Sequence, residues 1–353
     1  MIDIKKDGAY SRLENAGKNN FDTLRFLLAF TVFLVHASFL SGATSLQIIP
    51  RFLSSEFAVK SFFVVSGFLI FLSYENSHSL KDYLFKRLRR IYPGYVIVIT
   101  ASALLGFAIS TYPRSFCFDT EILKYLASNL VFLNFLHPGL PGVFLENHVQ
   151  AVNGAIWTLK IEVMFYLCVP MFVWLFNQVG RFSGMIFLFA ISVIYSYMLL
   201  AIHNNEGGDY LLELRRQLPG QLTYFIVGAA GYYYFEYFKR FAKPILLFAI
   251  LIFFFRADLP LTIFEPIALG VLVLYFATLF PYLGNFGKYG DFSYGIYILH
   301  FPVLQIFITY HLFGRSPLLA VLAAASTVMF LAVFLWNFVE KPFLQRNSHY
   351  VAG

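Results

Sequence analysis

The chain has 353 residues, of which 59% are hydrophobic by residue type and only 13% are charged, with a formal net charge of +7. A soluble globular protein carries about 25% charged residues, so this composition excludes a soluble fold, and the abundance of apolar residues excludes a disordered chain. With only two cysteines, a disulfide-stapled secreted scaffold is also excluded. The composition predicts an all-α integral membrane protein, in which the surplus Lys and Arg set the orientation and no nucleic-acid partner is expected.

The first apolar segment follows a basic polar stretch, residues 1–20, which we expect to be a cytoplasmic tail. The segment runs for 20 residues from Phe21 to Leu40. It is therefore longer than the apolar core of about 7–15 residues in a signal peptide, and we interpret it as a retained first span. Since a membrane-spanning helix needs about 20 mostly apolar residues, the sequence predicts ten spans, at 21–41, 57–73, 91–111, 154–177, 182–202, 218–238, 244–256, 262–282, 292–312 and 318–340.

These spans predict one membrane domain, residues 21–344, followed by a cytoplasmic tail at 345–353. A further apolar patch at 122–136 is interrupted by polar residues and is interpreted as interfacial or re-entrant. With the N-terminus inside, the inner loops and tails hold 16 Lys and Arg and the outer loops hold 7, which is the positive-inside pattern. Both termini are therefore expected in the cytoplasm, and the longest loop, 112–153, on the outer side.

Ionisable side chains are costly inside a bilayer, so those within predicted spans are candidates for function. Arg25 and His36 share the first span, eleven residues apart, which places them on one helix face about 16 Å apart along the axis. Histidine is the side chain most often used as a general base near neutral pH. Alternatively, Arg25 is a snorkelling anchor at the interface and His36 only makes an interhelical hydrogen bond.

A pair of arginines, Arg87 and Arg90, stands just before the third predicted span. Residues three apart share a helix face, so the two guanidiniums could clamp a phosphate or pyrophosphate. The same charges could instead only fix the orientation and bind anionic lipid.

The fourth predicted span carries a carboxylate, Glu162, at a depth comparable to that of His36. A carboxylate at this level could orient the imidazole or raise its basicity, which is what an acid/base pair requires. The alternative is a structural ion pair of Glu162 with Lys60 or, less readily, with Lys160, because residues 160 and 162 point apart on a helix.

Four further residues could line a cavity near His36: Ser66, Trp157, Tyr297 and His300. For His300, the alternative is a core histidine bonded to a carbonyl that Pro302 frees in its own helix. For Ser66 and the Gly67 that follows it, the alternative is close helix packing. The sequence contains no metal-ligand cluster, Gly-rich phosphate loop or serine-hydrolase elbow, so no metal is expected.

Together these segments resemble the membrane-bound acyltransferase 3 family. Single motifs are weak, but six of them occur in order across residues 19–342. They are Asn-Phe-Asp-Thr-Leu-Arg25 with His36, Phe-Phe-Val-Val-Ser66-Gly67-Phe, Lys-Arg87-Leu-Arg-Arg90-Ile-Tyr-Pro93, Trp157-Thr-Leu-Lys-Ile-Glu162 with Tyr166, Ser293-Tyr-Gly-Ile-Tyr297 with His300 and Pro302, and Val-Glu340-Lys-Pro342. Thr158 stands where many members have Ser, which retains the hydroxyl.

The resemblance implies a ten-helix bundle in a bacterial inner membrane that uses cytoplasmic acyl-CoA, with acetyl-CoA expected, to acylate a hydroxyl of a cell-surface carbohydrate or its lipid-linked precursor. By this likeness, His36 is the catalytic base, and Arg25, Arg87 and Arg90 hold the CoA phosphates or the acyl donor. The chain resembles the members that lack a fused extracytoplasmic esterase-like domain. The oligomeric state, the acyl group and the acceptor hydroxyl are left open.

Two other functions remain compatible with the sequence. In a transporter or flippase, Arg25, His36, Glu162 and His300 would form a polar pathway for a substrate or proton. No repeated pair of interrupted spans, as many secondary carriers have, supports that reading. In a non-catalytic membrane partner of a glycan assembly complex, the outer loop would matter and His36 would not.

Overall fold

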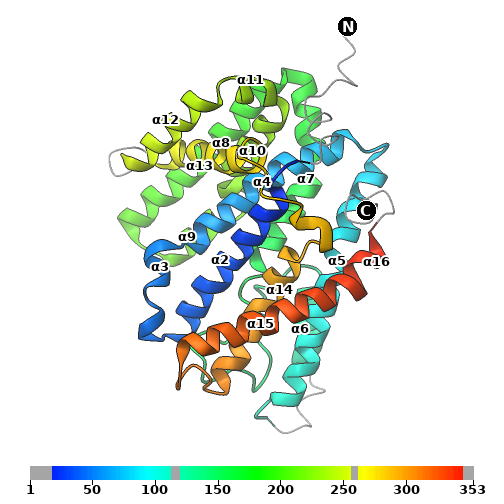
Figure 1. The fold of residues 1–353 in the computed structure, drawn as a ribbon, viewed down its shortest axis with the longest axis vertical. Coiled ribbons are helices and arrows are strands. Elements are labelled where there is room, and N and C mark those ends of the chain that lie inside the picture. Colours follow the sequence, from blue (N-terminus) through cyan, green and yellow to red (C-terminus); the bar gives the residue numbers. More distant parts are fainter. Residues whose placement is uncertain (1–17, 113–119, 256–260, 345–353) are drawn as a thin grey trace. The chain divides into compact units, whose positions relative to one another are not determined.

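The computed structural model describes residues 18–112, 120–255 and 261–344, which form helices and connecting loops (Figure 1). The predicted tails, apart from residues 18–20, lie outside this part of the chain. The chain folds into two compact units. The first unit comprises residues 60–84 and 161–286 with the chain up to Leu24, and the second comprises 25–59, 85–160 and the chain from Gly287 onward.

The helices follow one another as α2 (Phe21–Ser41), the 3₁₀ turn η1 (Thr44–Leu46), α3 (Ile49–Phe52), α4 (Ser55–Glu75), α5 (Leu80–Ile109), α6 (Thr120–Leu130), α7 (Trp157–Val179), α8 (Arg181–Glu206), α9 (Asp209–Arg215), α10 (Leu218–Tyr233), α11 (Phe235–Arg240), α12 (Ala242–Phe254), α13 (Leu261–Thr278), the 3₁₀ turn η4 (Phe286–Tyr289), α14 (Ser293–Thr309), α15 (Pro317–Leu335), the π-helical turn η5 (Trp336–Glu340) and α16 (Lys341–Phe343). Each of the ten predicted spans overlaps a helix, although the span predicted at 218–238 is divided between α10 and α11, and the one predicted at 318–340 continues from α15 into η5. Within the residues that the structure describes, six helical segments are long and apolar enough to cross a membrane, and shorter apolar helices accompany them. The chain is therefore an all-helical, multi-pass membrane protein.

Several helix boundaries differ from the prediction, notably that of α5 and those near α6. The third span was predicted at 91–111, but α5 begins eleven residues earlier, at Leu80, so Arg87 and Arg90 belong to the same helix as that span and share a face, as their spacing predicted. Leu, Lys and Arg are good helix formers, and the charges lower hydropathy without interrupting the helix. The patch at 122–136 overlaps the 11-residue helix α6, which begins at Thr120, ends at Leu130 and is too short to span.

Close approach of α4 to α10 organises the first unit. A Cβ atom on Gly67 would overlap the backbone carbonyl of Phe225, and one on Gly228 would overlap the carbonyl of Val64. At the same contact, the ring of Phe225 stacks on the ring of Phe165, with centroids 4.1 Å apart. Of the two readings of Ser66-Gly67, close helix packing therefore holds for Gly67, as is usual for glycine at membrane helix interfaces.

In the second unit, α14 is the most deeply buried helix near its middle, where His300 and Gln305 are 0% exposed. The loop before α7 wraps onto this helix through buried amides. Asn147 Nδ2 donates to the Gln305 carbonyl at 3.1 Å. Because Pro302 lacks an N–H, the Ile298 carbonyl has no helical partner, and Asn153 Nδ2 donates to it at 2.8 Å. The carbonyl that Pro302 frees is thus taken by an asparagine, which corrects the expectation that His300 would use it.

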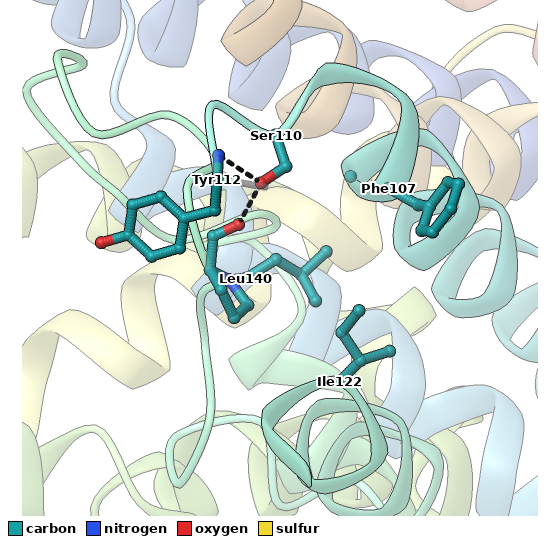
Figure 2. A pocket seen from close by; sticks show the side chains of 7 residues that line it. Phe107, Ser110, Tyr112, Ile122 and Leu140 are labelled. Atoms are coloured by element: carbon teal, nitrogen blue, oxygen red, sulfur yellow. Dashed lines mark hydrogen bonds between the residues drawn. The ribbon is translucent and has the colours of Figure 1, made fainter. Parts of the chain in front are cut away.

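The same loop is tied to the end of α5, as Figure 2 shows. Ser110 Oγ donates to the Pro141 carbonyl at 2.8 Å and accepts from the Tyr112 N–H at 3.2 Å. Beneath these bonds, Ile122 of α6 and Leu140 of the loop line a cavity of about 10 Å³. A cavity of that volume has room for about one water molecule, so it serves packing and not the binding of a substrate.

Candidate functional site

Two histidines meet in the second unit, one from α2 and one from α14. His36 Nδ1 and His300 Nε2 are 2.8 Å apart. The rings lie nearly parallel, with centroids 5.1 Å apart and an interplanar angle of 18°. Both residues were candidates from the sequence. Their hydrogen bond joins positions 264 residues apart in the chain, which is a pairing that no local pattern could have indicated.

Aromatic rings and a carbonyl hold this imidazole pair in place. Phe301 packs edge-on against both rings, with centroids 5.6 Å from His36 and 6.3 Å from His300. His300 Nδ1 lies 3.2 Å from the Ile296 carbonyl oxygen, one helical turn earlier. The rotation of both imidazoles is therefore restricted by packing as well as by hydrogen bonds.

Tyr297, a predicted cavity residue, lies beside His300 with ring centroids 5.9 Å apart. Its hydroxyl is 2.6 Å from the hydroxyl of Thr158, near the start of α7, and 3.2 Å from the Ala155 carbonyl oxygen. The hydroxyl that Thr158 retains in place of Ser is therefore part of a buried network next to the histidines. Trp157, which begins α7, is half-buried.

At the start of α2, Arg25 forms an ion pair with Asp291, which comes just before α14. The Nη2–Oδ2 distance is 2.8 Å, and the same oxygen also bonds Arg90 of α5. Asp291 is buried, and its other oxygen accepts the Ser293 hydroxyl at 2.5 Å. Burial alone would raise the pKa of Asp291, but the two guanidiniums hold that pKa below its usual value. Asp291 is thus a charged carboxylate that joins α2, α5 and α14.

Glu340, from the last predicted motif, approaches the other side of Arg90 with an Nη1–Oε2 distance of 3.5 Å. The Arg90 guanidinium also lies over the rings of Trp336, at 5.9 Å, and Tyr294, at 6.0 Å. Arg87 lies one turn earlier on α5 and is half-buried. The structure therefore brings Arg25 and Arg90 together through a shared carboxylate, and Arg87 stands on the same helix as Arg90.

Glu162 belongs to the first unit, where its carboxylate accepts the Tyr166 hydroxyl at 2.5 Å. Lys60, which the sequence offered as its ion-pair partner, bonds Glu265 of α13 at 2.7 Å. In the second unit, the Lys160 ammonium lies over the Phe135 ring at 4.7 Å. The role of Glu162 toward His36 stays a prediction. Ser66 is half-buried on α4 in the first unit.

A cavity of about 470 Å³ lies at the C-terminal ends of α2 and α14. Three hydroxyl-bearing residues line it, Ser41, Thr44 and Ser45, together with His311 and Phe313. The Thr44 and Ser45 hydroxyls and the His311 ring form no hydrogen bond with any other residue that the structure describes. These groups are available to a ligand.

The ion pair, the histidine pair and the cavity follow one another in the same order along α2 and along α14. Arg25 and Asp291 pair at the start of the two helices, His36 and His300 pair midway, and the cavity lies where both helices end. The two helices therefore run parallel. Across the described ranges, no group of three or more His, Cys, Asp or Glu side chains is placed to hold a metal ion.

Comparison with known proteins identifies the family of this chain. The family model described as "Acyltransferase domain" matches residues 18–337. The chain is 28% identical over 341 residues to an O-acetyl transferase of Shigella phage Sf6, covering 94% of this chain and 97% of that protein. It is 26% identical to nodulation protein 10 of Rhizobium leguminosarum bv. viciae, covering 95% of each chain. It is also 23% identical to the putative peptidoglycan O-acetyltransferase YrhL of Bacillus subtilis, covering 80% of this chain and 50% of that one. No solved structure matches. With the family model covering nearly the whole chain, this protein belongs to the acyltransferase 3 family.

Proposed function

We propose that this protein transfers an acyl group, with acetyl expected, from cytoplasmic acyl-CoA to a hydroxyl of a cell-surface carbohydrate or its lipid-linked precursor, with His36 as the general base. The observation that carries this proposal is the order of features along α2 and α14: guanidiniums at one end, paired imidazoles midway and a hydroxyl-lined cavity at the other end. The names of two relatives, an O-acetyl transferase and a putative peptidoglycan O-acetyltransferase, support the same reaction class.

The cationic end suits the phosphates of the donor. Arg25, Arg87 and Arg90 bring three guanidiniums to this end, and the first and the last of them share the Asp291 carboxylate. Guanidinium forks bind phosphate oxygens bidentately and keep their charge at all relevant pH values. From Arg25 to His36 the helix rises about 16 Å, a distance that the extended pantetheine arm of CoA can bridge. A donor held by its phosphates at Arg25 would present its thioester near His36.

The opposite end suits a polyhydroxylated acceptor. The hydroxyls of Thr44 and Ser45 and the imidazole of His311 can exchange hydrogen bonds with sugar hydroxyls, while Phe313 offers a ring against the apolar face of a sugar. The positive-inside rule assigns the arginine end to the cytoplasm, so the cavity faces the outer side, where a cell-surface glycan or its lipid-linked precursor is found. This orientation brings the donor and the acceptor to the histidines from opposite sides.

In the reaction, the imidazole of His36 takes the proton of the acceptor hydroxyl while its oxygen attacks the thioester carbonyl carbon. The tetrahedral intermediate collapses with cleavage of the carbon–sulfur bond. The departing CoA thiolate takes the proton back from the imidazolium, so that base and acid are the same residue. An ester and free CoA are the products, and no oxidant or metal takes part in the proton balance. Glu162 is a second candidate catalytic residue, to which no step of the acyl transfer is assigned.

The direct test is mass spectrometry of surface glycans and lipid-linked precursors from cells with and without the gene. The proposal predicts an acyl mass increment, 42 Da for acetyl by chemical composition, that disappears with the gene and returns when the gene is restored. A transporter would instead change the amount or location of an unmodified glycan. In proteoliposomes, substrate movement without acyl-CoA and without ester formation would overturn the proposal in favour of that alternative.

A further inference from the structure

We infer that His300 is a positioning residue that holds His36 in the tautomer whose Nε2 carries the reactive lone pair. This inference rests on the proposed function, because it specifies which nitrogen of His36 acts as the base. The observation behind it is an unbroken line of contacts from the Ile296 carbonyl through His300 to His36.

The positions of the protons follow from what each group can donate. A backbone carbonyl only accepts, so the 3.2 Å contact between the Ile296 oxygen and His300 Nδ1 requires a proton on Nδ1. A neutral His300 then has a bare Nε2, which can only accept. The 2.8 Å bond to His36 therefore takes its proton from His36 Nδ1. With Nδ1 protonated, a neutral His36 is left with a lone pair on Nε2.

The opposite arrangement is disfavoured. If His300 donated from Nε2 while neutral, its bare Nδ1 would face the lone pairs of the Ile296 oxygen at 3.2 Å, which is repulsive. A doubly protonated His300 would place a charge on a residue that is 0% exposed. Among the described residues of the second unit, neither imidazole forms an ion pair with a carboxylate, since Asp291 and Glu340 bond arginines and Glu121 lies beside His137.

This tautomer directs the acid/base chemistry. In water, neutral histidine more commonly carries its proton on Nε2. In that form the Nε2 of His36, which points away from the bond to His300, would be a hydrogen-bond donor and could not act as a base. The hydrogen bond to His300 reverses this preference and fixes the plane of the ring, as hydrogen-bond partners of the other ring nitrogen do for metal-bound and catalytic imidazoles. When Nε2 takes the acceptor proton, the charge on the imidazolium strengthens the Nδ1–H bond to His300. His300 thus supports the charged state that forms only during reaction.

The first experiment separates this role from packing by three substitutions in the full-length protein in proteoliposomes. His300→Phe keeps an aromatic ring but removes the acceptor, and kcat is expected to fall by about 10²–10⁴-fold with little change in the KM for acyl-CoA. His300→Gln can still accept from His36 and donate to Ile296, so it should recover most of the lost kcat. His148→Phe, an exposed histidine in the same unit, is the control and should leave kcat unchanged. Wild-type kcat in His300→Phe, or a loss in His300→Gln as large as in His300→Phe, would overturn the inference.

The second experiment reads the tautomer directly and does not depend on activity. Solid-state NMR of histidine ¹⁵N in bilayers distinguishes protonated from bare ring nitrogens, and His36→Gln assigns the signals of His36. The inference expects a protonated Nδ1 and a bare Nε2 on His36, with the Nε2–H form becoming populated in His300→Phe. A protonated Nε2 on neutral His36 in the wild-type protein would contradict the inference. If the NMR result holds but His36→Gln still acylates, the proposed base is wrong while the tautomer assignment stands.

Discussion

Arg25 and Asp291 form a nearly buried ion pair, with 2.8 Å between guanidinium nitrogen and carboxylate oxygen, at the point where α2 and α14 begin. Since the same oxygen bonds Arg90, this carboxylate determines where two of the three candidate donor-binding guanidiniums lie. Donor binding by Arg25 and Arg90 is therefore expected to depend on Asp291, which contacts both arginines.

Replacing Asp291 by Asn should destabilise the protein by about 3 kcal/mol, because removing one partner of a buried ion pair leaves the others without compensation. We also expect a higher KM for acyl-CoA, since Arg25 and Arg90 lose their common anchor. Thermal unfolding in detergent and steady-state kinetics measure the two effects. Asp209→Asn, which changes an exposed carboxylate at the start of α9, is the matched control. A stable variant with unchanged donor KM would show that the ion pair does not organise the site.

The pH dependence of this ion pair has a definite sign. The pKa of Asp291 in the folded protein lies below that of the unfolded chain, which is about 4. Its contribution to stability is therefore fully present above that value and is lost as the pH falls toward the folded pKa. The difference in Tm between wild type and Asp291→Asn should be constant from about pH 8 to pH 6 and should shrink only below about pH 4. A difference that disappears near pH 6 would contradict this assignment of charge.

The two arginines of α5 should contribute to donor affinity, whereas their exposed neighbour should not. The double variant Arg87→Gln, Arg90→Gln should raise the KM for acyl-CoA by about 10–100-fold, which is the effect of losing charge-assisted hydrogen bonds. Arg89→Gln is the control, because Arg89 is exposed on the same helix. Equal effects of Arg89→Gln and the double variant would indicate that the cluster acts only through general charge. The single variant Arg87→Gln tests the contribution to donor binding while leaving the ion pair between Arg90 and Asp291 in place.

Filling the cavity at the ends of α2 and α14 should affect the acceptor and not the donor. Ser45→Trp would place an indole inside the cavity of about 470 Å³ and obstruct it, so the KM for the carbohydrate acceptor should rise while that for acyl-CoA stays the same. Gln47→Trp, at an exposed neighbouring position outside the cavity lining, is the control. If Ser45→Trp acylates its acceptor as well as Gln47→Trp does, the acceptor uses another route.

Hydrophobic length and charge were sufficient to predict the helical membrane fold and the approximate positions of the long apolar helices, but not the short helices α3, α9 and α11. Arg25 and His36, predicted on one helix face, both contact residues in or next to α14. Periodicity identifies which face of a helix is special, but it does not identify the neighbour that the face contacts. For this reason His300 was a candidate without an assigned partner, although it bonds His36.

Asp291 was missed for a related reason. It stands in a short polar connection between two predicted spans, where a charge ordinarily marks a loop. Its importance comes from burial between arginines of α2 and α5, which only tertiary packing creates. The one signal in the sequence that could have indicated Asp291 is its position two residues before Ser293, where the motif with Tyr297 and His300 begins. The helical start of α5 was missed because a hydropathy criterion excludes charged turns even where their helix propensity is high.

The central claim is that the imidazole of His36 is the base of an acyl transfer. It is tested most directly by purified wild-type protein and His36→Gln in proteoliposomes, supplied with acyl-labelled acyl-CoA on one side and the carbohydrate acceptor on the other. Thermal unfolding and acyl-CoA binding serve to show that the variant is folded. We predict that label reaches the acceptor in the wild type and that the rate falls by about 10²–10⁴-fold in His36→Gln while donor binding is retained. Transfer at the wild-type rate by a folded His36→Gln protein would contradict the account.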